Sequence, residues 1–285
     1  MASKSKLGRF NVQLLSGDLE SLLTDSFARF IGIAVGFVLW SVLAMQFPRE
    51  LLPTPTETLL LAWGLVADGT AWIHIATTFQ SLFWAFLFAM LLGGTLGILM
   101  GINSYSQNFF TPYVNIGLSI PGLAWAATTF LVFTYSATAL GTLRFTPVLA
   151  ATLTVFPYIA INIWKGVENI DHDLLRMADA FSISRPRMLW RIVLPNIAPQ
   201  IFSAIRFGLA IGWKVTIIAE LFAGSAGIGF KLEHAYQVYQ YEEAWAWAAV
   251  FLIIIVLIEY GVFKPIERRA FAWRTDVELS NIGGQ

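Results

Sequence analysis

The chain of 285 residues contains no cysteine, which excludes disulfides, thiolate metal sites and a cysteine nucleophile. Charged residues are scarce as well, at 13% of the sequence, against roughly 25% in soluble domains. Hydrophobic residues make up 57%, and the mean hydropathy is +0.67. This shortage of charge is too large for a soluble core and predicts an integral membrane protein. Lysine and arginine balance aspartate and glutamate at 18 each, so nothing indicates a nucleic-acid partner.

Several functional motifs are missing from the sequence. There is no Gly-x-x-x-x-Gly-Lys-[Ser/Thr] loop and no Gly-Lys pair, so we expect any ATP hydrolysis to belong to another protein. No His-Glu-x-x-His or Gly-x-Ser-x-Gly motif occurs, which argues against a membrane protease or hydrolase and leaves no catalytic candidate. His74, His172 and His234 fall in different predicted loops, so we expect no metal site. The first 26 residues lack a compact apolar stretch, and we expect no cleavable signal peptide.

Six stretches are apolar and about as long as the roughly 20 residues that cross a bilayer. They predict an all-α membrane protein with six transmembrane helices. The stretches are 30–47, 75–102, 113–133, 145–164, 197–222 and 245–263. Between the first two, residues 51–63 indicate a turn and a short helix outside the hydrocarbon, with Pro53, Pro55 and Thr56 setting its start.

The positive charges indicate the orientation. Thirteen lysines and arginines lie before the first stretch, between the fourth and fifth, and after the sixth, whereas the opposite loops carry only Arg49, Arg144 and Lys231. We therefore expect both termini and the loop after the fourth stretch to face the cytoplasm. The chain then divides into a cytoplasmic arm 1–29, a membrane domain 30–264 that includes the loop 165–195, and a cytoplasmic tail 265–285.

The loop 165–195 is longer than a simple connection needs, and its first part has the pattern of an amphipathic helix. Asp171 is expected to cap the N-terminus of this helix. One helical face is apolar and carries Leu174, Met177, Ala178 and Phe181.

The pattern breaks at Ser182-Ile-Ser184, and Pro186 is placed to begin a second short helix, 186–193, which Leu194-Pro195 ends or kinks. The residues alone leave three ways to cover the apolar face of the first helix. It can pack on its own bundle, lie in lipid headgroups, or dock into a groove on a soluble partner. The single cation within 171–181 weighs against the headgroups.

Residues 176–195 resemble the "EAA" loop of binding-protein-dependent ABC importer permeases, in which Glu-Ala-Ala is followed by a Gly and further on by Leu-Pro. Other segments are similar to the nitrate, sulfonate and taurine branch of that family. These segments are Leu51-Leu-Pro-Thr-Pro55, Gly93-Gly-Thr-Leu-Gly97 with Gly101, residues 162–171, residues 206–213, Ala219-Glu220 and Gly227-Ile-Gly229. The resemblance covers roughly residues 51 to 273.

The resemblance implies the fold of a type I ABC importer permease in a bacterial inner membrane. The chain would bind no cofactor itself, and ATP and magnesium would be bound by two cytoplasmic ATPase subunits. A second permease copy would complete the pathway, and a periplasmic or lipid-anchored solute-binding protein would deliver a small anionic solute. The coupling helix would lie around 178–184, and the coupling residues would be Leu174, Met177, Ala178, Asp179, Ala180, Phe181, Ser182, Ile183, Ser184 and Pro195.

Two residues depart from the family's pattern. Arg176 stands where the family has Glu, which changes the charge offered to an ATPase. Ser182 stands where the family has Gly, which places the tight turn after the helix in question, because serine tolerates positive φ poorly. Either the ATPase is adapted to these changes, or the chain pairs with a second, more typical permease; a homodimer is the favoured alternative.

Three charged residues fall within the fifth stretch, where each costs a few kcal/mol in lipid and should face the bundle interior or an aqueous path. Lys214 lies near the middle of this stretch. It can favour an anionic substrate or pair with a carboxylate or carbonyl of a neighbouring helix or subunit, and both alternatives stay open. The candidate pathway residues are Pro121, Trp125, Arg206, Trp213, Lys214 and Glu220.

Two other classes of function compete with an importer permease. An intramembrane enzyme would need a paired catalytic constellation, and none accompanies Glu220, Lys214 or Asp171. A secondary transporter would be expected to have inverted repeats or clustered acidic residues at mid-depth, and neither is evident. Only an importer permease is expected to bind a separate ATPase in fixed stoichiometry, so co-purification of an ATPase distinguishes it from an intramembrane enzyme and from a secondary transporter.

Overall fold

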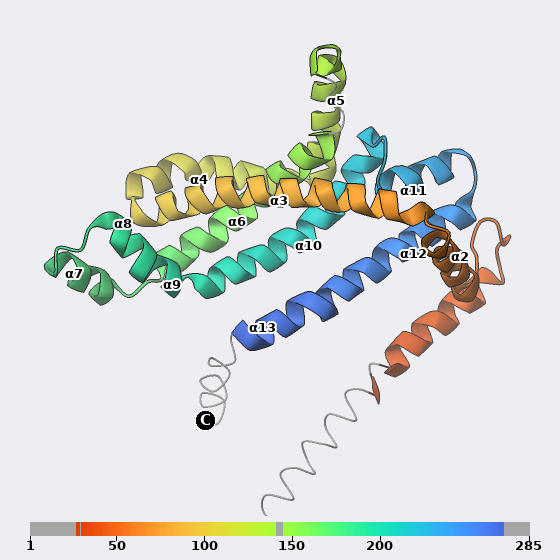
Figure 1. Ribbon diagram of the computed structural model, residues 1–285, viewed down its shortest axis with the longest axis horizontal. Helices are drawn as coiled ribbons and strands as arrows, with labels where there is room; N and C mark the ends of the chain where they lie inside the picture. Colours follow the sequence, from red (N-terminus) through yellow and green to blue (C-terminus); the bar gives the residue numbers. More distant parts are fainter. Residues whose placement is uncertain (1–26, 29, 141–144, 271–285) are drawn as a thin grey trace, which may run out of the picture.

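A computed structural model describes residues 27–28, 30–140 and 145–270, and each regular element within these ranges is a helix (Figure 1). Most of the predicted arm 1–29 and tail 265–285 lies outside the described residues. After a helix at Phe30–Ala44, the elements are α2 (Pro55–Ala67), α3 (Thr70–Ile102), α4 (Ser104–Ser119), α5 (Gly122–Leu140), α6 (Thr146–Glu168), α7 (His172–Ala180), α8 (Arg185–Met188), a π-helical turn (Leu189–Val193), α9 (Leu194–Asn196), α10 (Ala198–Ala223), α11 (Ile228–Gln237), α12 (Tyr241–Ile258), a second π-helical turn (Glu259–Phe263) and α13 (Lys264–Ala270).

Four of the described helices are long and apolar enough to cross a membrane: α3, α6, α10 and the continuous run Tyr241–Ile266. The pair formed by α4 and the first part of α5 qualifies as a fifth if it is one bent span. The first predicted span, 30–47, is a helix of only Phe30–Ala44 in the described residues, which is shorter than a bilayer crossing. The structure therefore supports four to five spans where the sequence predicted six.

The third predicted span, 113–133, is broken in its middle. Helices α4 and α5 meet at an angle of 96° across Ile120 and Pro121. Ile120 is extended, with φ −78° and ψ 121°, because the proline ring excludes the helical conformation from the residue before it. Pro121 then starts α5, where its carbonyl accepts from the N–H of Ala124.

Helix α6 forms the centre of the bundle, between α3 and α10 (Figure 1). Val155, Ile159 and Ile163 on α6 are at most 2% exposed. Helix α3 approaches α6 closely through glycines: a Cβ on Gly97 would lie 2.6 Å from the carbonyl oxygen of Ala160, and one on Gly93 would clash with Phe156. Small residues four apart are what allow two helices to pack this closely in a membrane.

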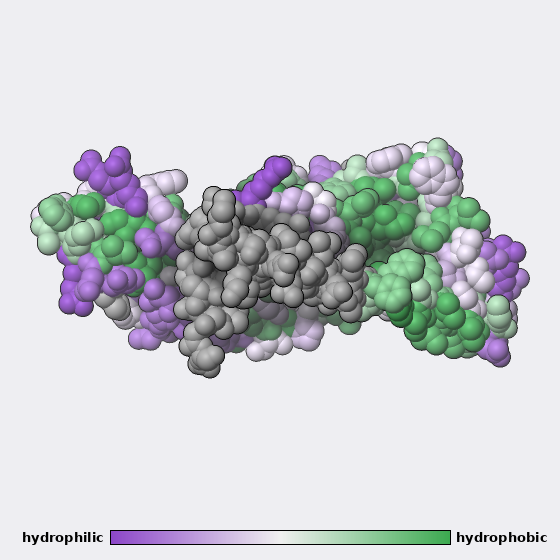
Figure 2. Space-filling model, turned by 90° about the horizontal axis from the view of Figure 1, so that it is seen from below, coloured by the Kyte–Doolittle hydropathy of each residue, from purple (hydrophilic) through white to green (hydrophobic). Residues whose placement is uncertain are grey.

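The two ends of the molecule differ in character. Helices α7, α8 and α9 lie at one end, and α2 and α11 lie at the other (Figure 1). Hydrophobic residues form a broad surface over the half that contains α2, and hydrophilic residues gather at the end that contains α7 and α8 (Figure 2). A broad apolar surface is what a helix bundle presents to lipid, because hydrocarbon solvates apolar side chains and excludes charge.

Helix α2 begins at Pro55, one of the three residues predicted to set its start. Its N-cap is Thr54, which the sequence analysis did not name: the Thr54 hydroxyl accepts from the N–H of Glu57, and the Glu57 carboxylate accepts from the N–H of Thr54. This is a capping box, and Pro55 occupies the first helical position, where its missing N–H leaves nothing unpaired. The sequence analysis missed the Thr-x-x-Glu spacing that identifies this cap.

Replacement of Thr54 by alanine should lower the free energy of unfolding by about 1 kcal/mol, because it removes one half of the capping box. The backbone N–H of Thr54 lowers the pKa of Glu57. Because the pKa of Glu57 is lower in the folded protein than in the unfolded chain, the ionised carboxylate stabilises the folded protein at pH values above the unfolded pKa. This contribution is lost as the pH falls through the folded pKa. Thermal unfolding in detergent at pH 7 and pH 3 measures both effects. Thr56→Ala serves as the control, and an equal loss in both variants would contradict the assignment of the cap.

Candidate functional site

A groove runs along helix α10 and is walled by α3 on one side and by α12 with its π-helical turn on the other. Its volume is about 660 Å³. Three of the six predicted pathway residues line it: Arg206, Trp213 and Lys214. The rest of the lining is mostly apolar and consists of Phe79, Leu82, Phe83, Phe86, Leu209, Ala210, Ile255, Ile258, Glu259, Val262 and Phe263. Arg206 and Lys214 therefore lie on the wall of one groove.

Arg206 is paired within the groove. Its Nη2 lies 2.7 Å from Oε1 of Glu259, and both side chains are about one-third exposed, at 34% and 32%. Glu259 is the first residue of the second π-helical turn. The sequence analysis counted charges in the fifth stretch and missed Glu259, although a lone carboxylate inside the sixth stretch was visible there.

Lys214 is exposed on the wall of the groove and forms no ion pair within the described residues. The neighbouring Trp213 is 4% exposed and is held by two aromatic rings. It stacks on Phe251 of α12 with a centroid distance of 5.8 Å, and it meets Phe79 of α3 edge-on at 5.0 Å. Trp213 therefore fixes the wall from which Lys214 projects.

The other predicted pathway residues lie elsewhere. Pro121 and Trp125 stand at the bend between α4 and α5 and do not line the groove. Glu220 is 1% exposed and is enclosed by α3 and the start of α11. His74, which the sequence placed in a loop, is on α3 beside this carboxylate.

The interhelical segment 172–196 is partly buried and partly exposed. On α7, Ala178 is fully buried and Leu175 packs against the core of α6. Met177 and Phe181 are 47% and 75% exposed. The predicted apolar stripe is therefore divided, since one edge packs on the bundle and the other faces outward. The side chain of Asp179 lies outside the described part of the structure.

The end of α7 keeps the tight turn that the sequence placed in question. Ser182 has φ +51°, in the left-handed region, and the N–H of Ile183 donates to the carbonyl of Ala178 at 3.0 Å. This hydrogen bond over five residues is that of a Schellman turn, in which glycine is the usual residue at the left-handed position. Serine therefore occupies a glycine conformation here. Asp171 accepts from the N–H of Asp173, as expected for an N-cap.

The second short helix covers Arg185–Val193 as α8 and a π-helical turn, which agrees with the predicted 186–193 within one residue. The sequence predicted that Leu194-Pro195 ends or kinks this helix, and in the structure the two residues continue it into α9, which ends at Asn196. The N–H of Leu194 donates to the carbonyl of Leu189, five residues back. Pro195 has no N–H, and its ring would clash with the carbonyl four residues earlier, so a widened turn before it avoids the conflict.

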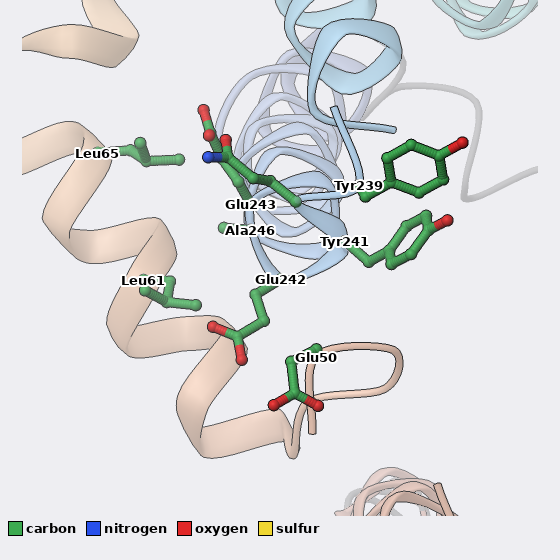
Figure 3. A pocket seen from close by; sticks show the side chains of 9 residues that line it. Glu50, Leu61, Leu65, Tyr239, Tyr241, Glu242, Glu243 and Ala246 are labelled. Atoms are coloured by element: carbon green, nitrogen blue, oxygen red, sulfur yellow. The ribbon is translucent and has the colours of Figure 1, made fainter. Parts of the chain in front are cut away.

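A second cavity of about 510 Å³ lies at the end of the molecule that contains α2. Figure 3 shows Glu50, Glu242 and Glu243 around it, with the rings of Tyr239 and Tyr241 on one side and Leu61 and Leu65 of α2 on the other. Arg49 offsets part of this charge: its Nε lies 3.0 Å from Glu57 and 3.9 Å from Glu242. The sequence analysis assigned nothing to these residues.

Comparison with known proteins places these features in context. The family of binding-protein-dependent transport system inner membrane components matches residues 93–269. The taurine transport system permease protein TauC of Escherichia coli (strain K12) is 28% identical over 247 residues, which cover 85% of this chain and 87% of that protein. The nitrate import permease protein NrtB of Leptolyngbya laminosa is 26% identical over 235 residues, covering 78% and 81%. An inward-facing structure of the MetNI methionine ABC transporter has the same fold, with a TM-score of 0.59 and 18% identity over 70% of this chain and 97% of that one.

Replacement of Ser182 by glycine should stabilise the end of α7 by about 1 kcal/mol, because glycine adopts positive φ without steric cost. Ser184 is the matched control, since it has φ −63° and Ser184→Gly relieves no strain there. Thermal unfolding in detergent, followed by circular dichroism, measures the difference. An increase in Tm for Ser184→Gly equal to that for Ser182→Gly would contradict the explanation.

Proposed function

Since the chain belongs to the family of binding-protein-dependent transport system inner membrane components, we propose that it moves a small anionic solute into the cytoplasm by alternating access. It is a permease subunit of an ABC importer, and ATP hydrolysis belongs to a separate subunit. The relatives are named for taurine, sulfonates, nitrate and bicarbonate, which all carry negative charge. The observation that carries the proposal is the groove along α10, in which Lys214 projects without an ion pair in the described residues.

The groove is suited to an anion by its chemistry. The Arg206 guanidinium is neutralised by Glu259 at 2.7 Å, so the positive charge left on the wall is that of Lys214. An ammonium in a mostly apolar groove attracts an anion more strongly than it would in water, because the surroundings screen it less. We assign Lys214 as the residue that favours anions, and Arg206 with Glu259 as the ion pair that joins α10 to the end of α12 in this conformation.

The proposal includes a second permease copy and a six-span topology. The helix Phe30–Ala44 is apolar and exposed along most of its length, which supports its role as part of the first span. The bent pair α4 and α5 counts as one further span in this scheme. With both termini in the cytoplasm, α7 and α8 would face two ATPase subunits that bind ATP and magnesium, and the end with α2 would face the solute-binding protein. A homodimer would place two Lys214 side chains along one pathway.

The segment proposed to contact the ATPase is narrower than the sequence suggested. Ala178 is fully buried, so Ala178→Asp would damage the packing of the permease itself. Phe181 is 75% exposed, and Met177 beside it is 47% exposed. These two side chains form a small exposed apolar surface at the end of α7, and Phe181 is its more exposed residue. Such a surface suits a helix that docks into a hydrophobic groove of a partner.

Replacement of Phe181 by aspartate should weaken binding of the ATPase by about thirtyfold, which is the effect of losing an interface residue worth roughly 2 kcal/mol. Co-purification of the tagged permease with its ATPase measures the loss. Val238→Asp is the control, because Val238 is 45% exposed at the opposite end of the molecule. Normal ATPase recovery with Phe181→Asp would exclude this residue from the contact, and no ATPase with the unmodified chain would contradict the proposed function.

Replacement of Lys214 by methionine should raise the KM for an anionic solute by about tenfold, because it removes a charge-assisted contact worth roughly 1.5 kcal/mol. The KM is measured from uptake into inner-membrane vesicles. Taurine, nitrate and bicarbonate are tried first with the unmodified chain, and the one taken up fastest is used to compare the variants. Lys214→Arg keeps the charge and should stay within about twofold. Lys231→Met removes a charge outside the groove and is the second control. Unchanged uptake by Lys214→Met would exclude the anion site.

A further inference from the structure

Glu220 is a buried carboxylate that the groove does not use. It lies near the end of α10 and is 1% exposed. Its Oε2 accepts from the Thr78 hydroxyl of α3 at 2.9 Å and from the N–H of Gly229 in α11 at 3.0 Å. One oxygen of one side chain therefore holds three helices together. Its other oxygen, Oε1, has no hydrogen-bond partner among the described residues.

The start of α11 is bound entirely to side chains of the other two helices. The N–H of Gly227 donates to Nδ1 of His74 at 3.2 Å, and the N–H of Ile228 donates to the Thr78 hydroxyl at 2.9 Å. The first N–H groups of a helix have no partner within it, and the partial positive charge there favours a carboxylate. The Thr78 hydroxyl both accepts from α11 and donates to Glu220, so it joins the two contacts.

The backbone around the carboxylate has no room for a side chain. Gly227 has φ +122°, and a Cβ there would lie 2.6 Å from Oε1 of Glu220. Trp247 of α12, which is fully buried, closes the site from outside and meets the His74 ring edge-on at 5.5 Å. His74, Thr78, Glu220, Gly227 and Gly229 form what we call the Glu220 latch, in which all members except the partly exposed His74 are buried.

A carboxylate in this position is a weak choice for stability alone. Removing a charge from water costs several kcal/mol, and apolar residues of similar volume often stabilise a buried site equally well. The carboxylate adds directional hydrogen bonds, and these fix how α10, α3 and the start of α11 are oriented relative to one another. Lys214 and Trp213 lie on the same helix, within two turns of Glu220.

We propose that Glu220 is a positioning residue that makes the adjoining ends of α3, α10 and α11 one rigid unit throughout the transport cycle. When α10 moves, α11 and the end of α3 move with it, and the groove near Lys214 keeps its shape on that side. The change of access then takes place between this unit and α12, where the groove is open. This proposal depends on the alternating-access function proposed above.

Spin-label distances test the proposal directly, because the chain has no cysteine and needs no background substitutions. Ile73→Cys on α3 and Tyr236→Cys on α11 place labels at side chains that are 66% and 60% exposed. In the complete transporter with its ATPase, their distance should be narrow and equal with and without ATP. A second pair, Phe207→Cys on α10 and Val262→Cys beyond α12, spans the groove, and its distance should change with ATP.

Thr78→Val removes the hydroxyl that joins the two contacts and should broaden the first distance distribution at least twofold. Thr77→Val is the matched control, since the Thr77 hydroxyl bonds only to the carbonyl of Ile73 in its own helix. Glu220→Gln keeps an oxygen acceptor, so the distribution of the first distance should stay narrow in this variant. Glu220→Ala removes the acceptor and should broaden that distribution. If Thr78→Val fails to assemble, Gly227→Ala disturbs the same site through its positive φ and the missing space.

Two outcomes would overturn the proposal. One is an ATP-dependent change of the first distance in the unmodified chain, which would show that α11 moves relative to α3. The other is a narrow distribution of the first distance in Glu220→Ala, which would show that packing alone, without the Glu220 hydrogen bonds, holds α3 and α11 together. Absence of an ATP-dependent change in the second pair would contradict the placement of the movement at the groove, whereas absence of ATP-dependent uptake would contradict the alternating-access function itself, so the two failures are distinguishable.

Discussion

The close packing of α3 and α10 on the central helix α6 determines where polar groups can lie in this protein. Between helices in hydrocarbon the hydrophobic effect supplies little force, so backbone approach and buried hydrogen bonds must hold them together. Gly97 permits that approach, and the Thr152 hydroxyl of α6 donates to the carbonyl of Ala85 in α3 at 3.2 Å. On α10, Gly208 and Gly212 face Val155 of α6. Arg206 and Lys214 lie on the outward face of α10, where the groove forms, whereas Glu220 near the end of the same helix is buried.

Two prolines shape the elements that border the groove and the interhelical segment. Each π-helical turn ends two residues before a proline: one at Val193 before Pro195, the other at Phe263 before Pro265. In both, the residue before the proline donates its N–H to a carbonyl five residues back. The widened turn accommodates the proline without breaking the helix. At the second site it also sets Glu259, the first residue of the turn, opposite Arg206.

Much of the fold followed from the sequence, because hydrophobic stretches of membrane length are a strong signal. The limits of α3, α6 and α10 agree with the predicted stretches within about five residues. The bend at Pro121 divides the single predicted stretch 113–133, and its angle of 96° depends on packing that no local pattern encodes. The sequence placed the tight turn at Ser182 in question, because serine gives no indication of positive φ, yet Ser182 adopts that conformation.

The candidate site was predicted less well, because its contacts join residues far apart in the chain. Arg206 and Glu259 are separated by 53 positions, and Thr78 and Glu220 by 142. The sequence indicated that each charge in a span faces the bundle interior or an aqueous path, but it could not name the residue that pairs with it. The sequence also could not predict that α7 has a buried edge at Ala178 and an exposed edge at Phe181. A helical wheel identifies the apolar face of a helix, but it does not show which part of the protein covers that face.

The arrangement of these sites along the chain has a mechanical consequence for the proposed function. From α8 through α9 to α10 the helical path continues with a single break, at Ile197, where the backbone departs from the helix but its N–H still donates to Val193. Arg206 and Glu220 then lie 14 positions apart on α10, or about 21 Å along its axis. A displacement of α8 therefore has a nearly rigid route to the groove and to the latch beyond it. The helix is interrupted at two places between α7 and α10 where the direction of the movement can change: at residues 181–184, which include the left-handed Ser182, and at Ile197.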